Sequence, residues 1–121
     1  MSEPTYETER LKGRTKRLAI ALFQIFRTLP KTVDARLVGR QLIRAASSVA
    51  ANYRAAGRAR SRAEFIAKIG TVVEEIDETV FWIEMLSDTG ILPAAATKDL
   101  LAEANELLAI FAASQRTAHR S

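Results

Sequence analysis

Apolar residues recur at helical spacing in four stretches of the chain, and no stretch shows the strict alternation of a β-strand. The third stretch has the clearest stripe along one side of a helix. Its members are Phe65, Ile69, Val72, Val73, Ile76, Val80 and Ile83. The pattern predicts helices over about residues 7–29, 34–56, 61–89 and 93–115, followed by a polar tail over residues 116–121.

Capping and helix-breaking residues fall where these stretches meet. Asp34 is suited to cap the second helix, and Ser61 with Glu64 forms a Ser-x-x-Glu capping box for the third. The expected end signals are Pro30, Gly57 and Gly90. Four amphipathic helices with short connections predict an all-α fold, an up-and-down antiparallel four-helix bundle that forms a single domain.

The second helix should bury a stripe of apolar and small side chains. The stripe consists of Val38, Leu42, Ala45, Ala46, Val49 and Tyr53. Residues 45–51 are all Ala, Ser or Val, so another helix can approach them closely. In the third helix we expect Ile76, in the middle of its stripe, to be fully buried.

The net charge of +4 conceals a strong segregation of charge along the chain. Residues 10–62 carry 14 bases and one acid, whereas residues 63–115 carry two bases and ten acids. This segregation suits a polyanionic partner. It equally suits a basic helix that lies against an acidic helix of the same or another subunit. The bases crowded into the first half of helix 7–29 also require acids nearby, since cations are unfavourable at a helix N-terminus.

Six arginines fall on one face of the second helical region, opposite its buried side. They are Arg36, Arg40, Arg44, Arg54, Arg58 and Arg62. If one helix continued unbroken through them, the row would be about 39 Å long. Three interpretations remain open: a solvated face, contact with the acidic third helix of a neighbouring subunit, or a track for phosphates. The candidate nucleic-acid-binding residues are Arg36, Arg40, Arg44, Arg54, Arg58, Lys12, Lys16 and Arg17.

Trp82 lies on the outer side of the third helix, away from the apolar stripe. One interpretation packs it against the first or fourth helix of the same protomer. The other makes it an anchor of a subunit interface, where Trp and Met are enriched. The candidate interface residues are Trp82, Phe81, Met85, Glu75 and Glu78.

No constellation typical of an enzyme, a metal site or a cofactor site is found in the sequence. The chain has no cysteine, and its one histidine, His119, lies in the polar tail, so a bundle di-metal site is not expected. Ser47 and Ser48 have no histidine to activate them, and we expect Asn52 to be a structural hydrogen-bonding residue. There is neither a signal segment nor an apolar run of about 20 residues. We therefore expect a non-enzymatic protein of the cytoplasm, without a membrane role.

The middle of the chain carries a specific pattern of polar residues. Residues 41–56 read QLIRAASSVAANYRAA, and Ser-x-x-Glu-Phe at 61–65 and Glu-x-x-Glu at 75–78 follow. This pattern resembles the bacterial four-helix-bundle proteins encoded in intervening sequences of 23S ribosomal RNA genes. Relatives of that family include the accessory protein of diversity-generating retroelements. The resemblance implies a protomer that assembles into a ring, typically a pentamer, and in the accessory-protein branch a basic barrel that binds nucleic acid and a protein partner.

Two hypotheses result. In the first, an oligomeric bundle binds RNA or DNA through its basic surface, without strong sequence specificity. In the second, a ring serves only structural or protein-interaction roles, and its charges are used in subunit contacts.

Overall fold

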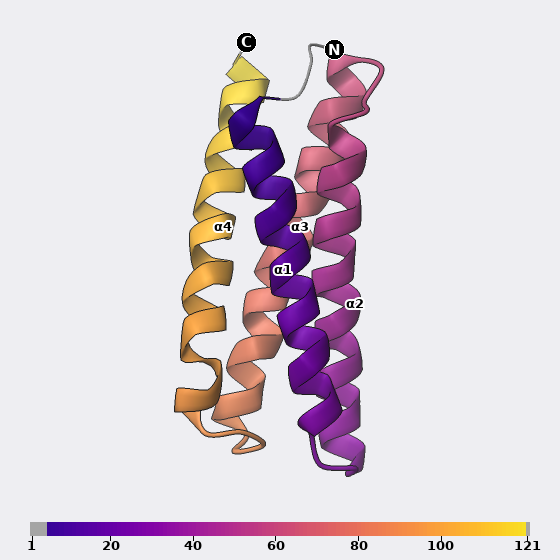
Figure 1. Ribbon diagram of the computed structural model, residues 1–121. Coiled ribbons are helices and arrows are strands. Elements are labelled where there is room, and N and C mark those ends of the chain that lie inside the picture. Colours follow the sequence, from indigo (N-terminus) through magenta and orange to yellow (C-terminus); the bar gives the residue numbers. More distant parts are fainter. Residues whose placement is uncertain (1–4, 121) are drawn as a thin grey trace.

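The computed structural model describes residues 5–120, which form four long helices. They are α1 (Tyr6–Thr28), α2 (Val33–Ala56), α3 (Arg62–Asp88) and α4 (Ala94–Arg120). The helices run alternately up and down, with α1 in front of α3, and the start of α1 and the end of α4 lie at the same end of the bundle (Figure 1). The described residues contain no strand, and the prediction of an all-α four-helix bundle is confirmed.

Hydroxyl side chains cap the first three helices. Ser61 Oγ accepts a hydrogen bond from the Glu64 N–H at 3.0 Å, as the capping box predicts. The prediction of Asp34 as the cap of α2 is wrong, because α2 begins one residue earlier and Thr32 is its N-cap. The Asp34 carboxylate instead accepts hydrogen bonds from the Thr32 hydroxyl and the Ala35 N–H. These bonds, that from Thr32 foremost, lower the pKa of Asp34.

Helix ends follow the expected signals except at the C-terminus. α1 ends before Pro30, α2 ends at the cap Gly57, and Gly90 after α3 has a φ of 76°, a conformation that favours glycine. The predicted end of the fourth helix near residue 115 is too early, since α4 continues to Arg120. Residues 116–120 contain no Gly or Pro to stop the helix, and the Arg62 guanidinium donates to the Ala118 carbonyl.

The core consists of the predicted stripes, brought together from all four helices. Ile76 has no exposed surface, as expected, and neither do Leu22, Leu42 and Phe111. The rings of Tyr53 and Phe111 lie 4.9 Å apart in the same cluster. The predicted stripe of α2 is buried throughout, whereas two members of the α3 stripe, Phe65 and Val73, are only half-buried.

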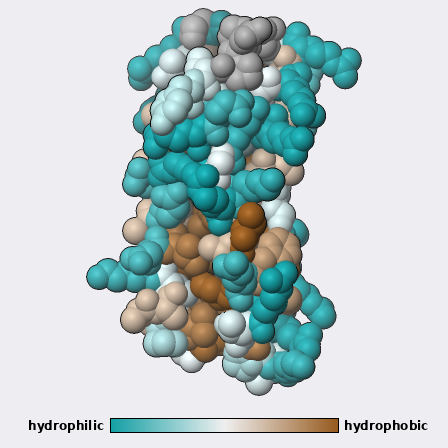
Figure 2. All heavy atoms as spheres, viewed as in Figure 1, coloured by the Kyte–Doolittle hydropathy of each residue, from teal (hydrophilic) through white to brown (hydrophobic). Residues whose placement is uncertain are grey.

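α1 packs mainly on α2 and has much less contact with α4. The end of α1 lies very close to α2, because a Cβ on Gly39 would lie only 2.6 Å from Cδ1 of Phe26. On the face seen in Figure 2, hydrophilic atoms dominate the upper half and hydrophobic atoms gather in the lower half. The upper end, where α1 begins and α2 ends, is therefore the place to look for a polar site.

Candidate polyanion-binding groove

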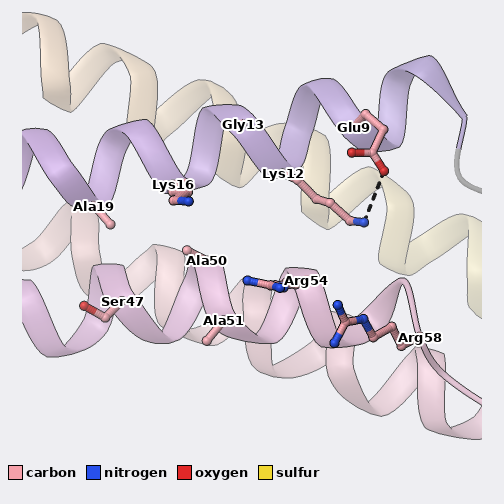
Figure 3. A pocket seen from close by; sticks show the side chains of 10 residues that line it. All are labelled: Glu9, Lys12, Gly13, Lys16, Ala19, Ser47, Ala50, Ala51, Arg54 and Arg58. Carbon is pink, nitrogen blue, oxygen red and sulfur yellow. Dashed lines mark hydrogen bonds and ion pairs between the residues drawn. The ribbon is translucent and has the colours of Figure 1, made fainter.

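A groove of about 630 Å³ lies between α1 and α2 at this hydrophilic end. Four cationic side chains line it: Lys12 and Lys16 from α1, Arg54 from α2, and Arg58 from the turn that follows. Lys12 extends from α1 toward α2, Arg54 lies at the edge of α2 that faces α1, and Arg58 extends along the end of α2 (Figure 3). Glu9 is the one carboxylate among the lining residues, and its Oε1 lies 3.2 Å from Lys12 Nζ. Four cations against one carboxylate give this groove a positively charged lining, which attracts anions.

The rest of the lining is small. It consists of Gly13, Ala19, Ser47, Ala50 and Ala51. The small-residue stretch 45–51 was expected to let another helix approach, and the structure divides it into two parts. Ala45 and Ala46 are buried in the core, whereas Ala50 and Ala51 lie on the groove side of α2. Because no large side chain fills the space, the groove stays open between its charged walls.

Lys12 is held from two sides. Its ammonium pairs with Glu9, and only 27% of its side chain is exposed. A Cβ on Gly57 would lie 3.7 Å from the Lys12 Nζ, so the ammonium lies beside the cap of α2. The C-terminal end of a helix carries partial negative charge, which stabilises a cation there. Lys12 is thus held in place by contacts within the fold.

Arg17, another candidate residue, does not line the groove. A Cβ on Gly13 would lie 2.8 Å from Arg17 Nη1, so the guanidinium folds back over this glycine. Its charge also helps to lower the pKa of Glu103 on α4, although the hydrogen bond from Arg14 is the larger cause. Arg17 therefore lies on α1 beside the groove wall, toward α4.

Arg44 is engaged within its own chain. Its Nη1 lies 3.2 Å from Glu75 Oε2, and its Nη2 donates to Glu78 Oε1. The Trp82 indole also donates to Glu78, at 3.2 Å. The hydrogen bond from Arg44, and next that from Trp82, lowers the pKa of Glu78. The acids that had been considered for a neighbouring subunit therefore pair with the basic helix of the same protomer.

The arginine row is not continuous. α2 ends at Ala56, and Arg62 belongs to the start of α3, where it donates to the Ala118 carbonyl of α4. Arg36 and Arg40 are exposed near the start of α2. The row therefore divides into two groups. The outer group is Arg36, Arg40 and Arg44, and the groove group is Arg54 and Arg58.

The cations at the start of α1 have the acidic neighbours that the sequence requires. Arg14 joins α1 to α4, because its Nη2 lies 2.6 Å from Glu103 Oε1 and 3.1 Å from Glu106 Oε1. Arg10 pairs with Glu7 at 3.1 Å within α1. These contacts engage Arg10 and Arg14 in ion pairs outside the groove.

A second groove, of about 620 Å³, lies between the start of α2 and the end of α3 and is almost entirely apolar. Val33, Leu37 and Phe81 line it and are exposed by 87%, 55% and 50%. Trp82 and Met85 lie beside them, half-buried, and the rings of Phe81 and Trp82 meet edge-on at 4.9 Å. Trp82 thus shares a surface with α2, and the candidate interface residues Phe81, Trp82 and Met85 form one apolar patch with it.

Three further observations concern the described part of the chain. Residues 5–120 contain no group of three His, Cys, Asp or Glu side chains that could hold a metal ion. Asn52 donates to the Ser48 carbonyl and hydroxyl at 2.9 and 3.0 Å, which confirms its structural role. None of the helices within these residues is long and apolar enough to cross a membrane.

Sequence reasoning missed several members of both grooves. Glu9, Ser47 and Ala50 carry no sign of a site when α1 or α2 is considered alone. The exposed Val33 and Leu37 were also missed, although two large apolar residues four positions apart on the polar side of α2 were a usable signal.

The fold and its surfaces define a class: a small helical bundle whose surface includes a cationic groove and an apolar groove. The chain belongs to the 23S rRNA-intervening sequence protein family, whose sequence model matches residues 10–113. The resemblance seen in residues 41–78 is thereby confirmed.

The fold is also similar to the crystal structure of a protein with unknown function from the S23 ribosomal protein family of Bacteroides thetaiotaomicron VPI-5482. The two chains are 23% identical and superpose with a TM-score of 0.82 over 90% of this chain and 97% of that chain. At this identity the likeness concerns the fold. No curated protein matches the chain.

Proposed function

We propose that this protein is a non-enzymatic bundle that binds RNA or DNA through the cationic groove between α1 and α2, without strong sequence specificity. The observation that carries the proposal is the meeting of Lys12, Lys16, Arg54 and Arg58 around one groove with a single carboxylate. Lys and Arg are the usual phosphate ligands of nucleic-acid-binding proteins. No aromatic residue lines the groove, so bases have no ring there on which to stack, and phosphate contacts would carry most of the binding.

We also propose that the protein works as a homo-oligomer, and the family resemblance favours a pentameric ring. The support from the fold is the apolar groove. It exposes Val33, Leu37 and Phe81 together, and single chains rarely leave such patches uncovered. Glu75 and Glu78 drop out of this proposal as direct interface residues, since both pair with Arg44 of their own chain.

A structural or protein-interaction ring without nucleic acid is the second candidate function. The same apolar groove favours it, because a surface for a second chain can be the main feature of the molecule. The two candidates differ in what the groove cations do: in the second, they are a solvated face.

The deciding experiment measures binding of unrelated oligonucleotides at low salt by fluorescence anisotropy, with two double variants. Lys16→Gln with Arg54→Gln should weaken binding to all sequences alike, by about tenfold, because each exposed charge contact contributes up to about 1 kcal/mol and about 1.4 kcal/mol is tenfold. The matched control, Arg36→Gln with Arg40→Gln, makes the same change of charge. Arg40 lies 14 residues before Arg54 on α2, which is roughly 20 Å at about 1.5 Å per residue. The control variant should therefore retain nearly full affinity. A wild-type protein that binds no nucleic acid at low salt refutes the proposal and leaves the structural ring.

A further inference from the structure

The shape of the cationic groove restricts which nucleic acid can enter it. Two packed helices have axes about 8–10 Å apart, so the trough between them is narrow. The major groove of duplex DNA alone is about 12 Å wide, and the duplex is wider still. A duplex can therefore touch only the rims of this trough, whereas one flexible strand can lie inside it.

The cations are arranged for a ligand that lies within the groove. Lys12 and Arg54 extend toward the space between the helices from opposite walls (Figure 3). On α1, Lys12 and Lys16 are four residues apart, a spacing of about 6 Å along the helix. A strand between the walls can thus place successive phosphates against cations of both helices. A convex duplex surface would meet the outermost charges only.

The lining between the walls fits a sugar–phosphate backbone. Gly13, Ala19 and Ala50 leave an open and largely apolar floor between the charged rims. Proteins that bind single strands without sequence preference use a positively charged groove that follows the backbone, often with aromatic stacking in addition. Because this groove has the charge and lacks the aromatic residues, recognition would rest on the backbone.

One end of the groove has a defined boundary. Glu9 pairs with Lys12 at 3.2 Å where α1 begins, and it brings the one negative charge of the lining. A strand that runs toward this end meets a carboxylate, which repels phosphate. The strand would therefore contact Lys16, Arg54 and Arg58 fully and Lys12 only in competition with Glu9.

From this geometry we infer that the α1–α2 groove binds the backbone of single-stranded nucleic acid and excludes the duplex. The inference rests on the proposed function, and it adds the class of ligand. The inference depends on the open space inside the groove as well as on its charge. A substitution that fills this space without changing any charge therefore tests it.

Ala50→Leu fills the groove floor without altering any charge, and Ala51→Leu does so from the exposed side of α2. Ala109→Leu on α4 is the matched control, because it makes the same substitution at an exposed helical position far from the groove lining. Leucine is a good helix former, so all three chains should retain the helix, which circular dichroism and thermal unfolding verify. Ala51→Leu keeps the test valid if the half-buried Ala50 position does not accept leucine.

Binding is measured for a labelled single strand and for a blunt duplex of the same length, at the same salt concentration. The wild type and Ala109→Leu should bind the single strand about tenfold or more tightly than the duplex, a difference of about 1.4 kcal/mol. Ala50→Leu and Ala51→Leu should lose this preference and bind the duplex unchanged.

Equal wild-type affinity for strand and duplex overturns the inference, and so does full single-strand affinity in both filled variants. In either case nucleic-acid binding itself stands, and the charge variant Lys16→Gln with Arg54→Gln decides separately whether that binding uses the groove cations. If the wild type binds neither probe, the proposed function fails and the inference fails with it.

Discussion

The Arg14 cluster should stabilise the contact between α1 and α4, and replacing Arg14 by methionine tests this. Arg14 Nε and Nη2 donate to the two Glu103 oxygens at 2.9 and 2.6 Å, and Nη2 also lies 3.1 Å from Glu106. Only 10% of the Arg14 side chain is exposed, compared with 32% for Glu103 and 63% for Glu106. α1 has few other contacts with α4, so this pair is a main link between the two helices.

The expected loss can be bracketed from these exposures. A hydrogen bond to a charged group contributes about 1.5–3 kcal/mol, and a fully exposed ion pair about 0.2–1 kcal/mol. Because Arg14 is largely buried and its partners are partly exposed, Arg14→Met should lower the free energy of unfolding by about 1–3 kcal/mol. Arg10→Met is the control, since Arg10 pairs with the exposed Glu7 within α1, and it should leave the stability nearly unchanged.

The effect should depend on pH in a defined direction. The hydrogen bond from Arg14 is the largest cause that lowers the pKa of Glu103, with burial opposing it. A carboxylate whose pKa is lower in the folded state stabilises the fold above its unfolded pKa, about 4.3 for Glu. This stabilisation is lost as the pH falls through the folded pKa. The advantage of wild type over Arg14→Met should therefore be full at neutral pH and decrease below about pH 4.3.

Urea unfolding followed by circular dichroism measures both quantities, at one protein concentration because self-association changes apparent stability. The double-mutant cycle of Arg14→Met with Glu103→Gln isolates the pair. A loss below about 0.5 kcal/mol at neutral pH would contradict the reasoning from Arg14 burial. A difference that stays constant down to pH 3 would contradict the assignment of Glu103.

Four other outcomes follow from the fold and its grooves. Ile76→Ala should lower the free energy of unfolding by about 2–5 kcal/mol. A loss under ~0.5 kcal/mol in urea unfolding would contradict the full burial of Ile76. Glu9→Gln should raise single-strand affinity several-fold in anisotropy, because Glu9 competes with the phosphates for Lys12. An unchanged affinity would show that Glu9 does not compete with the strand. Arg44→Gln should leave the salt dependence of binding unchanged, since its charge is used within the chain; a flatter slope would place Arg44 in the ligand contact. Sedimentation equilibrium should give several times 13.4 kDa, and a monomer at micromolar concentration would contradict self-association.

Helix positions could be predicted well because they depend on local patterns. The stripe around Ile76 repeats at helical spacing, and Ser61 and Gly90 mark the ends of α3 by their own backbone preferences. The end of α4 was misplaced, since residues 116–120 are polar but contain nothing that stops a helix. Polarity indicates an exposed segment, and it does not by itself indicate the end of a helix.

The destinations of the arginines could not be derived from the sequence, because they depend on how the helices pair. The partners of Arg44 are 31 and 34 residues away in the same chain, and a helical wheel cannot distinguish them from the same acids on a neighbour. The groove also depends on how the helices pair. Lys12 and Lys16 meet Arg54 and Arg58 because a short connection places the start of α1 beside the end of α2. The sequence contained both pairs, but only the packing of the two helices shows that they share one site.

The salt dependence of single-strand binding tests the central claim most directly. Each neutralised phosphate on a single strand contributes about −0.7 to the slope of log K against log salt, so three to four groove cations predict a slope of roughly −2 to −3. Lys16→Gln with Arg54→Gln should flatten this slope by about 1.4, and Arg36→Gln with Arg40→Gln should leave it unchanged. Equal flattening by both double variants would contradict the account, because the charge would then act from the whole basic surface and not from the groove.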